Sequence, residues 1–174
     1  KSNESIPSLL QEMLGEEYDV NVINGGVSGD TTQDGLARLQ TALDNHKPDI
    51  VLLALGGNDM LRRINPKETK KNIESMLEIL EDNDVRVILS EAQAPITLGF
   101  QYSVQFNAIF EEAAEEYEVE LIPFLIKDVY GQKEYMLPDG IHPNSEGARV
   151  IAESLVGIVS KAIDDLDSSW FGLF

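Results

Sequence analysis

The chain has 174 residues, with 13 lysines and arginines against 31 aspartates and glutamates, and a formal net charge of −18. This length suits one domain with a substantial core, and so negative a field repels phosphate backbones, which makes nucleic acid a poor candidate for a partner. The lack of cysteine excludes disulfides, thiolate nucleophiles and zinc–thiolate sites, and because no apolar run approaches the roughly 20 residues that cross a bilayer, stable membrane insertion is not expected.

Helix and strand patterns alternate along the first third of the chain. The spacing of apolar residues predicts a helix over residues 6–14, and residues 20–23 are predicted to form a short strand. Asp30 or Thr31 is a candidate N-cap for a helix that ends at about Leu43. The continuous apolar run over residues 49–55, closed by two glycines, predicts a strand that is buried on both faces.

The same alternation continues to the end of the chain. It predicts a helix over residues 66–80, capped by Asn65 and opened by Pro66, followed by a strand (85–89), a helix (102–117), a strand (119–122) and a helix (145–166). Strands and helices joined by short turns indicate an α/β fold, with a parallel sheet and helices on both faces. We find no repeat or linker, so residues 1–174 are expected to form a single domain.

The unusual residues of the chain lie in loops that follow the predicted strands, namely residues 25–30, 56–63, 91–100 and 123–144. In parallel sheets, ligands bind beyond the carboxyl ends of the strands. We therefore expect these loops to converge and to carry the functional residues.

Asp139 and His142 stand in the last of these loops, and His142 is one of only two histidines. A carboxylate that accepts from one ring N–H would fix the tautomer of the imidazole and leave its other nitrogen free to take a proton. A turn cap followed by a surface histidine explains this spacing at least as well, so the pair alone does not decide the function.

Two glycine-containing loops offer hydrogen-bond donors for a developing oxyanion. After residues 56–57 the chain can turn sharply and aim the Asn58 amide at such an oxygen, while Asp59 braces the loop through backbone N–H groups; an ordinary Gly-Gly-Asn turn is the alternative. The Gly29 N–H, close to a helix N-terminus, is a second candidate donor. Ser28 lacks the last glycine of a Gly-x-Ser-x-Gly elbow, so we interpret it as structural.

Taken in their order along the chain, the three motifs just described resemble sequence blocks of the SGNH (GDSL-type) hydrolases, especially of the bacterial thioesterase/lysophospholipase/arylesterase branch. Residues 25–39 are similar to the second block of that family, residues 56–59 to the third and residues 139–143 to the last. The resemblance implies a three-layer α/β/α, flavodoxin-like fold with strand order 2-1-3-4-5. It also implies His142 as general base, Asp139 as its orienting carboxylate, and Gly29 and Asn58 as oxyanion-hole donors.

The resemblance further implies an acyl pocket walled by Ile96, Leu98 and Phe100, a small acyl-ester or thioester substrate, and a reaction without metal or cofactor. The predicted activity is that of a serine esterase or thioesterase acting through an acyl-enzyme. Export of such relatives implies a periplasmic or secreted protein.

The first block of the family, a strand followed by Gly-Asp-Ser, does not occur among the 174 residues. That strand is internal in the family's sheet, and its loss would leave buried backbone groups unpaired at roughly 1–3 kcal/mol each. We therefore expect an N-terminally truncated chain that lacks the nucleophilic serine and is nearly inactive by itself. Two alternatives remain: a non-catalytic acyl- or carbohydrate-binding relative that has lost its serine, and an unrelated flavodoxin-like receiver or nucleotide-binding domain.

Overall fold

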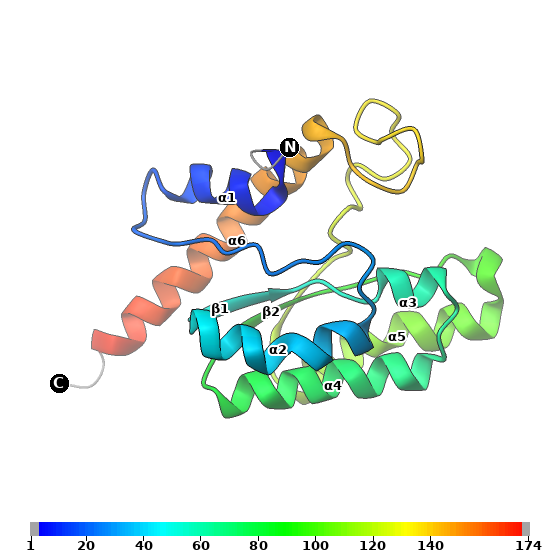
Figure 1. Ribbon diagram of the computed structural model, residues 1–174, viewed down its shortest axis with the longest axis horizontal. Coiled ribbons are helices and arrows are strands. Elements are labelled where there is room, and N and C mark those ends of the chain that lie inside the picture. Colours follow the sequence, from blue (N-terminus) through cyan, green and yellow to red (C-terminus); the bar gives the residue numbers. More distant parts are fainter. Residues whose placement is uncertain (1–3, 172–174) are drawn as a thin grey trace. The chain divides into compact units, whose positions relative to one another are not determined.

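The computed structural model describes residues 4–171, and the chain divides into two compact units. One unit is Val27–Leu125, and the other combines Lys1–Gly26 with Ile126–Phe174. The first contains the described β-sheet, and the second contains the first and last helices of Figure 1 with their adjoining loops. The single domain expected over residues 1–174 stays a prediction.

The sheet of unit Val27–Leu125 is parallel and has the strand order β1-β2-β3. Its strands are β1 (Ile50–Leu53), β2 (Arg86–Ser90) and β3 (Glu120–Ile122). In the register, Leu52 pairs with Ile88, and Leu89 pairs with both Leu53 and Leu121. The predicted α/β class with a parallel sheet is confirmed.

Helices α2 (Thr32–His46), α4 (Pro66–Asp82) and α5 (Phe100–Glu116) lie on one side of this sheet (Figure 1). The core between these helices and the strands includes the fully buried Ile73, Leu80, Leu89, Phe106 and Phe110. The helices begin where local sequence signals predict or close to it: Asn65 caps α4 and Thr31 caps α2 in a capping box, while α5 starts at Phe100 instead of at 102.

Strand β1 is less buried than its apolar sequence predicts. Ile50, Val51 and Leu52 are half-buried, and only Leu53 is buried. The reason is its position, because β1 lies at an edge of the sheet formed by the described residues and pairs there with β2 alone. An apolar run of this length indicates a strand but does not show how many neighbours the strand has.

In the other unit, α1 (Ile6–Leu14) packs against α6 (Ser145–Phe171). Helix α1 has the predicted bounds and buries Leu9, Leu10 and Leu14, while α6 continues past the predicted end at residue 166. A hydrogen bond of 3.1 Å from the Tyr18 hydroxyl to Asp164 Oδ1 also joins the chain after α1 to α6.

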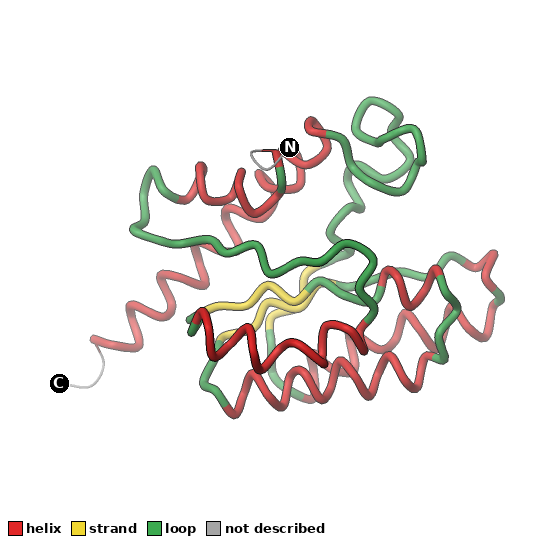
Figure 2. Tube along the Cα trace, in the orientation of Figure 1, coloured by secondary structure: helices red, strands yellow, loops and turns green. Residues whose placement is uncertain are grey.

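The predicted strand over residues 20–23 is wrong, and Figure 2 shows this segment as loop. Instead of a neighbouring strand, the side chain of Gln11 satisfies its backbone: Gln11 Nε2 donates to the Val20 carbonyl at 2.9 Å, and Val22 N–H donates to Gln11 Oε1 at 2.7 Å. Among the described residues, these two backbone groups are thus bound by one side-chain carboxamide and not by a neighbouring strand.

Candidate functional site

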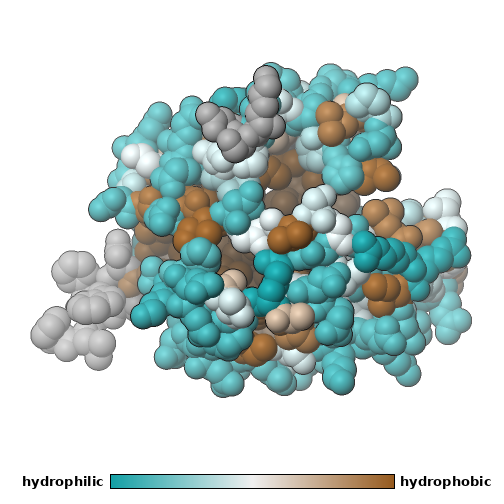
Figure 3. Space-filling model, viewed as in Figure 1, coloured by the Kyte–Doolittle hydropathy of each residue, from teal (hydrophilic) through white to brown (hydrophobic). Residues whose placement is uncertain are grey.

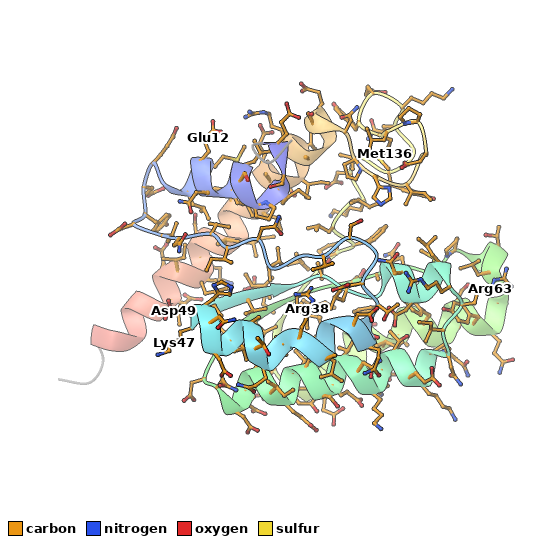
Figure 4. The ribbon with its side chains drawn as sticks, viewed as in Figure 1. Glu12, Arg38, Lys47, Asp49, Arg63 and Met136 are labelled. Carbon is orange, nitrogen blue, oxygen red and sulfur yellow. The ribbon has the colours of Figure 1, made fainter. Side chains whose placement is uncertain are left out.

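The loop that carries Asp139 and His142 is closed by backbone hydrogen bonds into a small hairpin-like turn. Met136, labelled in Figure 4, forms an isolated antiparallel bridge with Pro143. Leu137 N–H donates to the His142 carbonyl at 2.8 Å, and Gly140 N–H donates to the Leu137 carbonyl at 2.9 Å. Gly140 has φ +68°, a left-handed conformation that favours glycine. The turn therefore sets the positions of Asp139 and His142 locally.

Asp139 accepts three hydrogen bonds within this turn. Its Oδ1 accepts from the backbone N–H groups of Ile141 (2.9 Å) and His142 (3.0 Å), and its Oδ2 accepts from His142 Nδ1 at 2.9 Å. These donors, first the His142 N–H, then the Ile141 N–H, then the imidazole, lower the pKa of Asp139 to about 2.

The Asp139 carboxylate therefore makes the contacts of both interpretations at once, because it accepts from backbone N–H groups of the turn and from the imidazole. With Nδ1–H engaged by a charged carboxylate, the free lone pair of the neutral ring is on Nε2. The His142 side chain is 62% exposed, and its Nε2 makes no hydrogen bond with the residues that the structure describes. This arrangement can accept a proton from a neighbouring hydroxyl group.

In unit Val27–Leu125, Gly29 occupies a turn formed by residues 27–30. Its φ is +89°, and the Asp30 N–H donates to the Val27 carbonyl at 3.2 Å. The Gly29 N–H makes no hydrogen bond within residues 4–171, so it remains available as a donor. Ser28 is exposed in the same turn.

A short helix, α3 (Gly57–Leu61), carries Asn58 in its first turn, in a segment that was expected to be a loop. The preceding Gly56 has φ +106°, and a Cβ there would lie 2.9 Å from Cζ of the buried Phe110. Both the left-handed conformation and the close packing therefore require glycine at the junction between β1 and α3.

The Asn58 amide points to the turn that holds Gly29. Its Nδ2 donates to the Asp30 carbonyl at 2.9 Å, which leaves the second amide hydrogen free. Asp59, the next residue, is fully buried and accepts from Thr32 N–H (2.8 Å), Thr32 Oγ1 (2.5 Å) and Thr69 Oγ1 (3.1 Å). Asp59 was predicted to bind several backbone N–H groups, and it binds one, that of Thr32, together with two threonine hydroxyls. Asn58 contacts the residue next to Gly29 through the Asp30 carbonyl.

Two arginines that the sequence did not single out for the site also hold this turn. Arg62 Nη2 donates to the Gly29 carbonyl at 2.8 Å, and Arg38 Nε pairs with Asp30 Oδ2 at 2.7 Å. Figure 4 labels Arg38 on α2. Arg62 and Gly29 are 33 positions apart, so no local pattern could have predicted their contact.

The model of the GDSL-like Lipase/Acylhydrolase family matches residues 1–150. The chain belongs to this family. An arylesterase of Vibrio mimicus is 43% identical over 150 residues, which cover 86% of this chain and 75% of that protein. A thioesterase 1/protease 1/lysophospholipase L1 of Escherichia coli is 37% identical over 147 residues, 84% of this chain and 70% of that protein.

Among solved structures, the psychrotrophic esterase EstA from Pseudoalteromonas sp., inhibited by monoethylphosphonate, matches with a TM-score of 0.89 at 28% identity. The match covers 94% of this chain and 90% of that chain. The resemblance inferred from the sequence blocks is thus confirmed at the level of family and fold, and an unrelated receiver or nucleotide-binding domain is excluded.

The three predicted acyl-pocket residues differ in how much apolar surface they leave free. Ile96 and Phe100 are 68% and 71% exposed, whereas Leu98, in the 3-10 turn η2 (Ile96–Leu98), is partly buried against the core. Ile96 and Phe100 therefore leave apolar surface exposed, while Leu98 already packs against the core of its own unit.

A hollow of about 330 Å³ lies around Tyr117, at the amino ends of β2 and β3. Several glutamates surround it, and burial, followed by the charge of Glu78, raises the pKa of Tyr117 to about 12. It is at the opposite ends of the strands from Asn58, so we do not assign the chemistry to it. Within residues 4–171 no acidic or histidine cluster is arranged to hold a metal ion, and no helix has the length and apolar character of a bilayer span.

Proposed function

We propose that this protein is a serine esterase or thioesterase that hydrolyses acyl esters of the lysophospholipid, aryl-ester or acyl-thioester type through an acyl-enzyme. The observation that carries the proposal is the 2.9 Å contact between His142 Nδ1 and Asp139 Oδ2, which leaves Nε2 as a base. The names of the arylesterase and thioesterase/lysophospholipase relatives support this substrate class.

In the proposed reaction, His142 Nε2 takes the proton of a serine hydroxyl as the serine oxygen attacks the acyl carbonyl carbon. The Gly29 N–H and the free Asn58 amide hydrogen stabilise the oxyanion, and His142 then donates its proton to the departing alcohol or thiol. In the second half of the reaction, water attacks the acyl-enzyme by the same steps and the acid is released. Ile96 and Phe100 supply apolar contact for the acyl chain.

The proposal assigns the nucleophile to a Gly-Asp-Ser block, which the 174 residues do not contain. The 174-residue chain alone is therefore expected to show almost no turnover, because only the oxyanion donors would contribute. In the full-length gene product, a residue other than serine at that place would favour a non-catalytic acyl- or carbohydrate-binding protein.

Replacing the proposed base tests the assignment. In the full-length gene product, His142→Ala is expected to lower kcat for p-nitrophenyl butyrate by roughly 10⁴- to 10⁶-fold, because the serine loses its general base. Asp139→Asn should lower kcat about 10⁴-fold, because the required tautomer of the His142 imidazole is then no longer fixed. Steady-state hydrolysis, followed by absorbance, measures both.

His46, the only other histidine, is exposed at the end of α2 and provides the matched control. His46→Ala should keep wild-type turnover. A fluorophosphonate probe should label the full-length protein but none of the serines of the 174-residue chain. Near-normal turnover of His142→Ala, or labelling of the 174-residue chain, would contradict the proposal.

A further inference from the structure

One face of the short helix α3 and its C-cap residue holds three neighbouring points of the chain between residues 29 and 32. Arg62 donates to the Gly29 carbonyl (2.8 Å), Asn58 donates to the Asp30 carbonyl (2.9 Å), and Asp59 accepts from the Thr32 N–H (2.8 Å). Arg62 is the C-cap residue of α3, so all three contacts come from within five consecutive positions. These three contacts therefore attach the turn to α3.

Both polar groups of the peptide unit between Gly29 and Asp30, the Gly29 carbonyl and the Asp30 N–H, are hydrogen-bonded. The carbonyl accepts from Arg62 Nη2, and the N–H donates to the Val27 carbonyl at 3.2 Å. Gly29 itself has φ +89° and, as a glycine, has no intrinsic preference for that conformation. Without an external contact, rotation about the Gly29 torsions would change the direction of the adjacent Gly29 N–H.

We propose that Arg62 is a positioning residue for the reaction: by fixing the Gly29 carbonyl, it keeps the Gly29 N–H aimed at the oxyanion. This inference rests on the proposed function. Arg62 does not touch the substrate in this account. Its guanidinium acts through the backbone, and the fixed direction of a donor is what gives an oxyanion hole its effect on kcat.

The neighbouring Arg63 provides a matched control. Both arginines are exposed at the end of α3, and Figure 4 labels Arg63 at the turn that follows this helix. The Arg63 side chain makes no hydrogen bond or ion pair with any residue of the described chain, whereas Arg62 binds the Gly29 carbonyl. Replacing either arginine by glutamine removes the same charge, but only Arg62→Gln removes the contact.

The variants Arg62→Gln, Arg62→Lys and Arg63→Gln should be compared in the full-length gene product. Loss of a whole oxyanion donor costs about 10²- to 10³-fold in kcat, so a misdirected donor in Arg62→Gln should cost about 10- to 100-fold, with KM changed less than about twofold. Arg62→Lys retains a charged donor group at this position, so its loss of kcat should be smaller than that of Arg62→Gln. Arg63→Gln should match the wild type, and all variants should share its thermal midpoint within about 2 °C.

Hydrogen exchange of the Asp30 amide gives a second measurement that does not depend on turnover. Exchange should be at least about tenfold faster in Arg62→Gln than in Arg63→Gln, because the peptide loses one of its two holds. Equal kcat values, equal exchange rates, or loss of the fold in Arg62→Gln would overturn the inference. Failure of the proposed function is distinct: the wild-type protein would then hydrolyse no ester, while the exchange difference would persist.

Discussion

Asp139 keeps its negative charge because backbone donors, more than the imidazole, surround its carboxylate. The two N–H groups of Ile141 and His142 contribute first to lowering its pKa to about 2, and the His142 side chain follows. An ordinary aspartate has a pKa of about 3.9. The depressed pKa stabilises the turn fully above about pH 4, and this contribution is lost as the pH falls towards 2.

The titration of Asp139 should therefore have its midpoint near pH 2, as measured from the ¹³C chemical shift of its carboxyl group. In His142→Ala the midpoint should rise but stay below the ordinary value, because both backbone donors remain. A wild-type midpoint near 4 would show that the turn does not hold the carboxylate in solution.

At the residue scale, the sequence could predict what lies within one turn and little beyond it. Asp139 and His142 are three positions apart, so their spacing alone brings the carboxylate within reach of the imidazole. The contacts of Arg62 with Gly29 and of Asn58 with Asp30 span 33 and 28 positions. They depend on how β1 and α3 pack, and this information is not contained in any local pattern.

At the scale of elements, local signals located the helices, while the strands required knowledge of their partners. Asn65 and Thr31 cap their helices as predicted, because a cap binds N–H groups only a few residues away. Residues 20–23 have a strand-like sequence, yet their hydrogen bonds go to the Gln11 side chain. Helix α3 was missed because it has five residues, too few for an apolar period to appear.

The position of α3 depends on the buried carboxyl group of Asp59, and this dependence can be measured. Asp59→Ala would leave the Thr32 N–H and two threonine hydroxyls without their acceptor in a buried place. Unsatisfied buried groups cost about 1–3 kcal/mol each, so we expect a loss of about 3 kcal/mol or more in the free energy of unfolding, measured by urea denaturation.

Thr69→Val is the matched comparison. It replaces the Thr69 hydroxyl by a methyl group of nearly equal volume, while Asp59 keeps both contacts with Thr32. Thr69→Val should lower the free energy of unfolding by about 1 kcal/mol. Equal costs for Asp59→Ala and Thr69→Val would mean that Asp59 does not anchor α3.

At the scale of the whole molecule, charge is the property that the sequence determines without any knowledge of the fold. A net charge of −18 leaves most acidic side chains without a basic partner, and the visible face in Figure 3 is mainly hydrophilic. The ion pairs of Lys70 with Glu74 and Glu112 are both at the surface, where such pairs contribute little. Repulsion among the remaining carboxylates therefore opposes the compact state.

Salt should accordingly stabilise this protein. The Debye length falls from about 30 Å at 0.01 M to about 3 Å at 1 M salt, so NaCl at neutral pH should raise Tm by several degrees as carboxylate repulsion is screened. NaCl and KCl should act alike, and calorimetric scans at several concentrations measure the effect. At about pH 4.3, the isoelectric point of the sequence, the net charge is close to zero, so the same salt addition should raise Tm much less. A rise of equal size at both pH values would point to general exclusion of salt from the protein surface, and a fall in Tm with salt at neutral pH would mean that ion pairs outweigh the repulsion.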